Sequence, residues 1–263
     1  MTLITLALQI SVPAVLVALM SLAARRWGAT CGGLIMGLPW MTGPVLFFLG
    51  LNKGPEFLVT AAGGAILAVW GIAAFILVFG YAALRFGWAG SLIAATASYA
   101  ATGFVVQGID IPLGLATAVA VGALLSAYLL LPSPSAATAP PSPPSWDIAA
   151  RMAATFALVS VIMVSADLLG PKRSGLIASF PVILTVIGAF TQSQQGRNGL
   201  LRVLRGISLS LLAFTGFFAT VGTITPFAGQ FSAFATATAV ALAISATLIV
   251  WNQRQPKRPS AAR

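Results

Sequence analysis

The sequence predicts an all-α polytopic membrane protein with nine transmembrane helices in a 4+1+4 inverted-repeat arrangement. Three observations predict this fold: an apolar composition, a repeated segment and an uneven distribution of basic residues. The chain is 59% hydrophobic and 7% charged, with a mean hydropathy of +0.99, whereas soluble domains carry roughly 25% charged residues. Apolar runs recur along the whole chain, and each is long enough to cross a bilayer core of about 30 Å.

The segment 28–54 recurs without a gap at 170–196. Seven of the 27 aligned positions are identical, and each identical residue lies 142 positions from its partner. A fixed period of this kind indicates a doubled module. The identical pairs are Gly28/Gly170, Gly33/Gly175, Leu34/Leu176, Ile35/Ile177, Pro39/Pro181, Phe48/Phe190 and Gly54/Gly196.

Nine spans follow from the apolar runs. We expect the first to be an uncleaved anchor, because residues 1–9 contain no Lys or Arg and basic residues follow the run instead. The Pro/Ser-rich stretch 132–147 has no apolar periodicity and is typical of an extended, solvated linker. The predicted spans are Thr2–Ala23, Cys31–Leu51, Leu58–Leu84, Ala89–Gln107, Ile111–Leu131, Ile148–Leu169, Ser174–Ser193, Val203–Thr223 and Ala228–Trp251.

The basic residues favour nine spans with the N-terminus outside. In that topology eleven basic residues lie on the cytoplasmic side and three lie outside, as the positive-inside rule requires. Joining the fourth and fifth runs into one span would divide them five to nine, with no clear preference. The cytoplasmic set is Arg25, Arg26, Arg85, Arg151, Arg197, Arg202, Arg205, Arg254, Lys257, Arg258 and Arg263, and the outer set is Lys53, Lys172 and Arg173.

The period of 142 gives the repeat a direction. It places the first four spans on the last four and leaves the fifth span without a counterpart, so five crossings separate the copies and they enter the membrane from opposite sides. Such inverted repeats are typical of transporters, although a duplication that only enlarged a packed bundle is the alternative. The predicted divisions are 1–107 (first four-helix repeat), 108–131 (connecting helix), 132–147 (cytoplasmic linker), 148–252 (second, inverted repeat) and 253–263 (basic cytoplasmic tail).

A Gly-Leu-Ile-x-x-Leu/Phe-Pro element occurs in both copies and is the predicted substrate site. Proline lacks an N–H and frees a backbone carbonyl, and a broken helix at membrane depth lies against protein or a water-filled cavity. A simple proline kink packed by glycine is the alternative. The predicted substrate-binding residues are Gly37, Pro39, Trp40, Thr42, Ser179, Pro181 and Thr185.

Charged residues near the second element form a candidate ion or charge site. Asp167, near the outer end of the sixth span, is a candidate proton or cation ligand. Lys172 and Arg173 follow it and are placed to attract an anionic substrate or headgroup. Ordinary solvation or mutual pairing of these charges is the alternative, and no carboxylate lies in the middle of a span.

Missing residue types exclude several function classes. The chain has no His and a single cysteine, Cys31, so it has no usual metal set and no His-dependent nucleophile. We therefore expect no metal, no cofactor and no enzyme activity. The net charge of +10 lies in short loops and the tail, which favours topology determinants over a nucleic-acid surface. The expected partners are the lipid bilayer and a small-molecule or lipid-linked substrate, and a homodimer remains open.

The Gly-Leu-Ile-x-x-Phe-Pro element, followed by a glycine some fifteen residues later, resembles the small four-span membrane proteins of the GlpM type and a related domain family of unknown function. It would occur twice, at 33–39 with Gly54 and at 175–181 with Gly196, and the first copy has Leu38 in place of the aromatic residue. The resemblance implies an integral inner-membrane protein linked to polysaccharide or cell-surface physiology. It brings no catalytic residues.

Three functions remain open from the sequence. The favoured one is a secondary transporter or exporter of a small organic or lipid-linked solute, acting by alternating access in a bacterial-type inner membrane with the C-terminus cytoplasmic. The second is a non-transporting scaffold or assembly partner of a cell-envelope complex. The third, a lipid-modifying enzyme, lacks His, a metal set and paired carboxylates. A polar cavity between the second and seventh spans would separate the first two.

Overall fold

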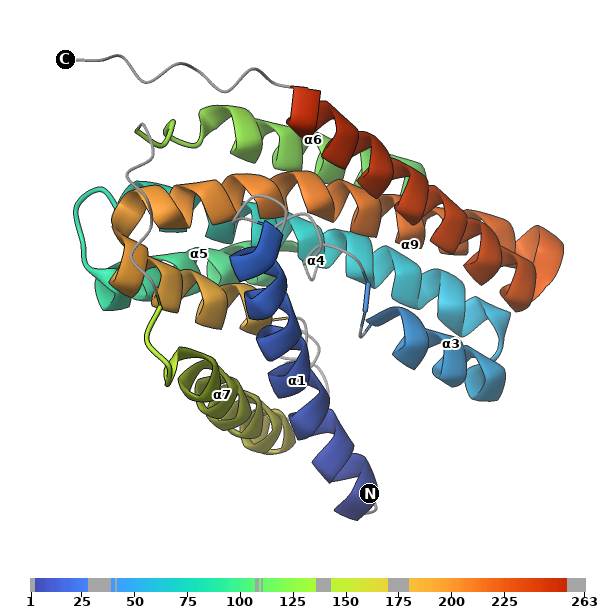
Figure 1. Ribbon diagram of the computed structural model, residues 1–263. Helices are drawn as coiled ribbons and strands as arrows, with labels where there is room; N and C mark the ends of the chain where they lie inside the picture. The colour runs from blue at the N-terminus through green and yellow to red at the C-terminus, as the bar shows by residue number, and fades with distance from the viewer. Residues whose placement is uncertain are drawn as a thin grey trace.

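The computed structural model describes residues 3–27, 39–40, 42–106, 109, 111–135, 143–169 and 180–254, without the side chains of 3–10, 24, 27, 163–169 and 252–253. Every regular element in these ranges is an α-helix, which confirms the predicted all-α class. With the labels of Figure 1, the helices are α1 (Leu3–Trp27), α3 (Thr42–Lys53), α4 (Pro55–Ala82), α5 (Trp88–Val106), α6 (Leu113–Leu130), α7 (Asp147–Leu169) and α9 (Val182–Arg254).

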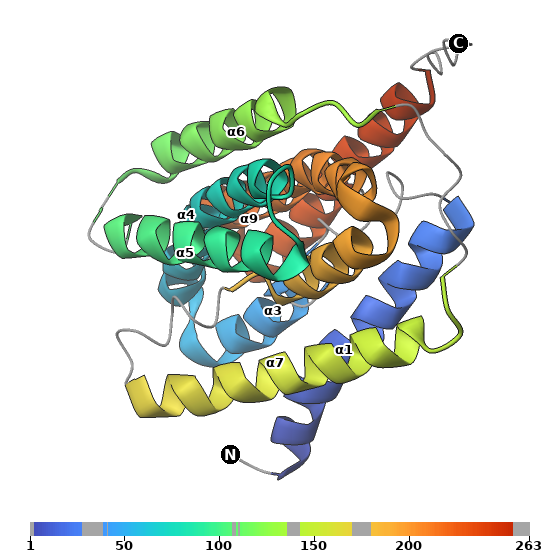
Figure 2. The same ribbon diagram turned by 90° about the vertical axis from the view of Figure 1, so that its left-hand side faces the viewer.

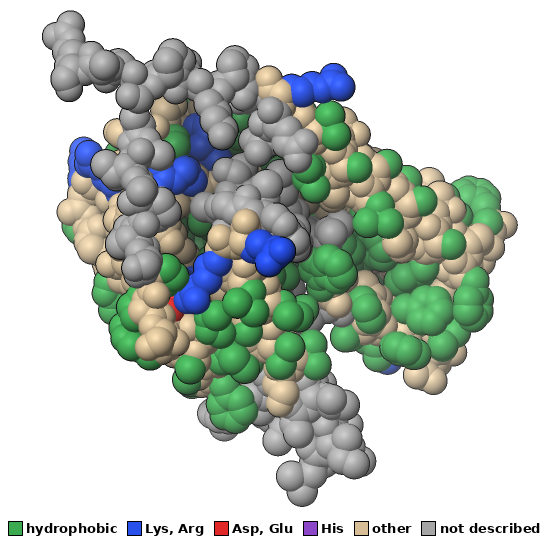
Figure 3. All heavy atoms as spheres, viewed as in Figure 1, with side chains coloured by type: hydrophobic (Ala, Val, Ile, Leu, Met, Phe, Trp, Pro, Cys, Tyr) green, Lys and Arg blue, Asp and Glu red, His purple; other side chains and the backbone are tan. Residues whose placement is uncertain are grey.

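Four helices of the described chain are long and apolar enough to cross a membrane, judged by length and composition. They are α4, α5, α6 and, within α9, residues 182–251. Large apolar side chains are also widely exposed: Phe104 is 80% exposed, Phe227 87% and Phe231 70%. Figure 3 shows hydrophobic side chains over much of one face, with Lys and Arg toward its top and left. The composition and this surface are those of a membrane protein, whereas nine crossings stay a prediction.

α9 is not one straight helix. Its backbone is non-helical at Gly196 (φ 67°, ψ −171°) and Gly229 (φ 77°, ψ 172°), and Figure 1 shows the chain changing direction at these turns. We call the straight parts segments 182–195, 197–228 and 230–254. They contain most of the seventh, eighth and ninth predicted spans. The observed bounds differ by several residues from the predicted ones because glycine places the turns, and the helices continue through the polar residues beside it.

The core lies between α4 and segment 197–228, and α6 packs across both. α6 turns small side chains toward them, since Ala116 and Ala120 are buried, and small residues let apolar helices approach closely. α4 and segment 197–228 supply the large side chains of the core. Their largest fully buried side chains are Leu58, Ile66, Phe75, Ile76, Phe79, Leu200, Leu201, Leu204 and Phe218.

α1 and α7 form a second helix pair beside this core. Arg25, near the end of α1, forms an ion pair with Asp147, the first residue of α7. The end of one helix therefore meets the start of the other, and Figure 2 shows the two running in opposite senses.

A shift of 142 positions relates the helix bounds of the two halves. Shifted by this number, α1 overlaps α7, and α3 falls at 184–195 inside segment 182–195. α4 falls at 197–224 and α5 at 230–248, inside the second and third segments of α9. α6 has no counterpart. The repeat seen in the sequence thus continues as a correspondence between helices, well beyond the identical residues.

Candidate functional site

Each Pro element lies at the start of a helix. Pro39 and Trp40 are non-helical just before α3, and Phe180 and Pro181 are non-helical just before α9. The carbonyl of Pro39 accepts a hydrogen bond from the Gly43 N–H at 3.0 Å, and that of Pro181 accepts one at 2.9 Å from four residues on. Proline suits a helix start because the N–H it lacks would have no helical partner there. Pro39 and Pro181 therefore each precede a described helix by one to three residues.

The two helices that begin at these prolines end in the same way. α3 ends at Gly54 (φ 86°, ψ 175°), and segment 182–195 ends at Gly196 with nearly the same angles. Glycine alone adopts this conformation without strain. At 1.5 Å per residue the two helices measure about 18 and 21 Å, which is shorter than a bilayer core of about 30 Å. Both are half-length helices bounded by Pro and Gly.

Residues at or just after each proline pack against an aromatic ring of the other half. Phe75 of α4 meets Phe180 edge to face with ring centroids 6.2 Å apart. Gly43 faces Phe217 of segment 197–228, since a Cβ atom on Gly43 would lie 3.5 Å from the ring. Phe75 and Phe217 are 142 positions apart. Tyr99 of α5 adds a second ring against Phe180, with centroids 5.5 Å apart.

The contact between α4 and segment 197–228 is reciprocal. A Cβ atom on Gly80 would lie 3.6 Å from Cδ1 of Leu204, and one on Gly222 would lie 3.4 Å from Cβ of Ala62. Gly80 and Gly222 are 142 positions apart, and so are Ala62 and Leu204. The end of each helix therefore meets the start of the other, through equivalent residues.

α6 covers both of these contacts with its two ends. A Cβ atom on Gly80 would clash with Leu131, just after α6, and one on Gly222 would lie 2.6 Å from Cδ2 of Leu113 at the start of α6. The helix without a repeat partner thus closes over the junction of the two halves. Tyr81 strengthens one end by donating a hydrogen bond to the Leu130 carbonyl at 2.7 Å.

The predicted substrate-binding residues fall at two helix starts. At α3, Trp40 is 50% exposed and Thr42 is also exposed. At α9, Thr185 is only 6% exposed, and within the described part of the chain its hydroxyl has no hydrogen-bond partner. Asp167 lies on α7, but its side chain is outside the described part. Gly37, Ser179, Lys172 and Arg173 also lie outside the described residues.

A buried polar cluster centres on Asp147, which the sequence predicts to lie in the solvated linker 132–147. That assignment is wrong, because Asp147 is the first residue of α7 and its side chain is only 1% exposed. Its Oδ2 accepts a hydrogen bond from Arg25 Nη2 at 2.6 Å, and its Oδ1 accepts one from Arg151 Nε at 2.9 Å. Gln194 Nε2 donates to Oδ1 as well, at 2.5 Å. We call these four residues the Asp147 cluster.

Local structure explains how these residues meet. A carboxylate is stabilised at the N-terminus of a helix and a guanidinium near a C-terminus, which suits Asp147 on α7 and Arg25 on α1. Arg151 follows Asp147 by one helical turn, and its guanidinium also lies over the Phe190 ring at 5.2 Å from the centroid. A signal was present in the sequence: Asp147 is the one acid on a predicted cytoplasmic side with eleven bases.

The environment of Asp147 favours its charged form. Asp147 lies just before the predicted span Ile148–Leu169. Burial acts to raise the pKa of its carboxyl, but hydrogen bonds from Gln194, Arg151 and Arg25 outweigh burial and hold the pKa below its ordinary value. Asp147 is therefore ionised near neutral pH. The cluster carries two guanidinium charges against one carboxylate.

Amide side chains join the helices at both ends of the molecule. Near the Asp147 cluster, Gln192 Nε2 donates to the Phe86 carbonyl at 3.0 Å and to Ser91 Oγ at 3.1 Å. At the other end, Gln230 Nε2 donates to the Phe47 carbonyl at 2.6 Å. In each case the half-length helix of one half is tied to the start of the fourth helix of the other half.

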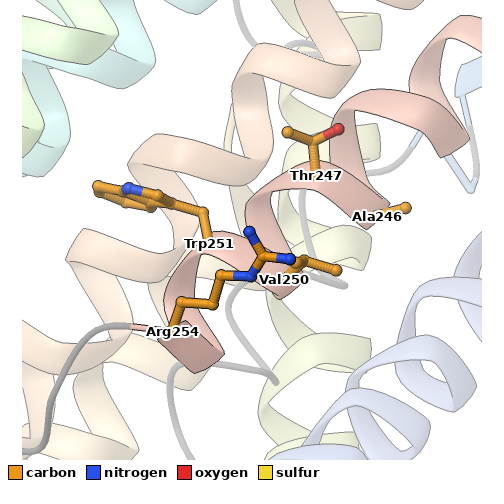
Figure 4. A pocket seen from close by; sticks show the side chains of 5 residues that line it. All are labelled: Ala246, Thr247, Val250, Trp251 and Arg254. Atoms are coloured by element: carbon orange, nitrogen blue, oxygen red, sulfur yellow. The ribbon is translucent and has the colours of Figure 1, made fainter.

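A hollow of about 450 Å³ lies on segment 230–254. The described residues that line it lie on this one segment, and Figure 4 shows their side chains. It includes no residue of the Pro elements or of the Asp147 cluster. The lining residues are Ala246, Thr247, Val250, Trp251 and Arg254.

Comparisons with known proteins find no relative. No family model matches the chain, and no curated protein or solved structure matches it either. Within the part of the chain that the structure describes, no group of three or more His, Cys, Asp or Glu side chains is placed to hold a metal ion.

Proposed function

We propose that this protein is a secondary transporter or exporter that moves a small organic or lipid-linked solute by alternating access between two inverted repeats. The observation that carries the proposal is the reciprocal contact of Gly80 with Leu204 and of Gly222 with Ala62. Because the two helices in contact are antiparallel, a two-fold axis relating them would lie in the membrane plane. Repeats related in this way can exchange conformations, which opens the opposite side of the membrane.

Contacts at the helix ends support the proposed nine-span topology in an inner membrane, with the N-terminus outside. One end joins Arg25, Phe86, Asp147 and Gln194, all at or near turns that the charge distribution assigns to the cytoplasm. The other end joins Gln230, beside the Gly229 turn that the charge distribution assigns to the outside, to Phe47 in α3. The contacts thus pair segments of the same predicted side.

The half-length helices support a substrate site near mid-membrane. If Gly54 and Gly196 lie near opposite surfaces, helices of about 18 and 21 Å would bring Pro39 and Pro181 close to the middle of the bilayer. Helix starts carry partial positive charge and unpaired N–H groups, and discontinuous helices of this kind bind substrate in transporters. The buried, unpaired hydroxyl of Thr185 adds a polar group at one of them.

The alternative is a non-transporting scaffold, which would keep the same helices in one arrangement. The resemblance to four-span inner-membrane proteins of the GlpM type fits either function. The two functions differ in motion, because alternating access requires the two ends of the molecule to open in turn.

Distances between spin labels test the motion without a known substrate. In a Cys31→Ser background, one pair, Arg26→Cys with Arg197→Cys, reports on the end that carries the Asp147 cluster. A second pair, Asn52→Cys with Phe231→Cys, reports on the opposite end. All four positions are exposed. Pulsed electron paramagnetic resonance in nanodiscs should give two distances for each pair, separated by about 5 Å or more.

Adding Asp147→Asn should change the populations of the two distances in opposite directions at the two ends. The longer distance should become more populated at the end that carries the Asp147 cluster and less populated at the opposite end. A third pair, Thr60→Cys in α4 with Leu84→Cys two residues after its end, is the rigid control. Single, unchanged distances in both end pairs would contradict transport and favour the scaffold.

A further inference from the structure

The Asp147 cluster contains more positive charge and more donors than its one carboxylate uses. A guanidinium has five N–H donors. Asp147 accepts one from Arg25 and one from Arg151, and in the described part of the chain neither side chain makes another hydrogen bond. The cluster therefore has one positive charge in excess. A buried charge is costly unless it is paired, and the buried Arg151 and the partly exposed Arg25 share this single carboxylate.

Gln194 adds a second unused group of the opposite kind. Its Nε2 donates to Asp147, while its Oε1 is buried and has no hydrogen-bond partner among the residues that the structure describes. A buried acceptor left unpaired costs free energy, so the cluster also lacks a donor. The missing partner is thus a group that is anionic and also carries an O–H.

Asp147 itself occupies the position that such an anion would take. Its carboxylate lies where the two guanidiniums and the Gln194 amide converge, and the side chain of Arg25, 33% exposed, connects this point with solvent. We propose that Arg25, Arg151 and Gln194 form a binding site for an oxyanion that carries a hydroxyl, such as a phosphate group, and that Asp147 is its internal competitor. The site takes the phosphate of a free solute or of a lipid headgroup.

This inference does not require the transport cycle. If the transport proposal holds as well, the site names the chemical class of the solute or of a regulatory lipid. Phosphate binding with a single fixed label distance would support the site and contradict transport. Two label distances without phosphate binding would support transport and contradict the phosphate site.

The test measures thermal unfolding of the purified full-length protein in detergent at pH 7, with inorganic phosphate replacing chloride at constant ionic strength. Phosphate should raise the unfolding temperature of the wild type in a saturable manner. Arg25→Gln and Arg151→Gln should each lose this increase. Arg26→Gln is the matched control, since it removes a neighbouring exposed charge that makes no contact with Asp147. It should keep the full effect.

Asp147→Asn separates a competitor from a merely structural residue. Removing the internal carboxylate should lower the half-saturating phosphate concentration, by roughly tenfold for a coupling of ordinary size. A structural role alone predicts weaker binding or none. Gln194→Met keeps both ion pairs and covers the case in which Asp147→Asn does not fold. It should raise the half-saturating concentration.

Two arms identify the source of the oxyanion. A response to inorganic phosphate in detergent indicates a free solute, whereas stabilisation in phosphatidylglycerol nanodiscs over phosphatidylcholine nanodiscs indicates a headgroup. Either result supports the site. No response in both arms, or an equal response in the Arg25→Gln/Arg151→Gln double variant, would overturn it.

Discussion

Arg25 Nη2 and Asp147 Oδ2 lie 2.6 Å apart and join the first helix of one half to the first helix of the other. α1 and α7 are equivalent under the shift of 142 positions, and this ion pair links the end of one to the start of the other. The carboxylate is buried and receives two further hydrogen bonds. The contact is therefore a structural link between the halves as well as part of a candidate binding site.

The first prediction concerns acid stability. The pKa of Asp147 is lowered in the folded protein, so the cluster stabilises the fold fully above the unfolded value of about 3.9. That contribution is lost as the pH falls below about 4 and through the lowered folded pKa. The unfolding temperature should be flat from pH 7 to 5 and then decrease.

Asp147→Asn should remove this part of the acid dependence and lower stability at pH 7 by about 3 kcal/mol, because it leaves two arginines without their carboxylate. Glu56→Gln is the control, since Glu56 is exposed and takes part in no ion pair in the described chain. An Asp147→Asn protein with wild-type stability and an unchanged acid limb would contradict the structural role.

The second prediction concerns the junction under α6. Gly80→Ala would place a methyl group against Leu131, and Gly222→Ala would place one against Leu113. Each should cost about 1 kcal/mol, at the low end for overpacking because the opposing atoms are flexible side-chain ends. Gly63→Ala is the control: no atom lies within 4 Å of a Cβ there, and alanine favours a helix by up to about 1 kcal/mol.

A double-mutant cycle decides whether the contact with Leu131 is the cause. Leu131→Ala should relieve the clash, so that Gly80→Ala costs less in its presence. Additive costs would show that the destabilisation of Gly80→Ala arises elsewhere.

The third prediction concerns the equivalent turns. Gly54 and Gly196 have φ of 86° and 67°, and a Cβ atom at either would meet no atom within 4 Å. Alanine should therefore destabilise both through backbone strain alone, by about 1–2 kcal/mol and to a similar extent. Gly87→Ala, at a turn without positive φ, should be nearly neutral. Unequal costs at positions 54 and 196 in thermal unfolding would argue against equivalent turns.

Several features could be predicted from the sequence because they depend on local composition or spacing. Long apolar runs can only be stable as helices in an apolar surrounding, so the all-α class followed from composition. Pro39 and Pro181 were expected to interrupt or begin a helix, since proline lacks the N–H, and both residues are non-helical. Gly54 and Gly196 were marked by the repeat, and their shared backbone angles are a local property of glycine.

The burial of Asp147 and its pairing with Arg25 and Gln194 were decided by the tertiary structure alone, whereas Arg151 is its neighbour one helical turn along α7. Arg25 lies 122 residues from Asp147, and Gln194 lies 47 residues from it in the other direction. These groups meet because α1 packs antiparallel on α7 and both helices dock on α9. No local sequence pattern encodes which distant helix ends will meet in this way. For the same reason the reciprocal contact of Gly80 with Leu204 and of Gly222 with Ala62 was hidden, since small apolar residues carry no signal of their partner. The sequence by itself determined which segments are helices and where they turn, through hydrophobicity and backbone chemistry, whereas only long-range packing decided which charges are buried and paired.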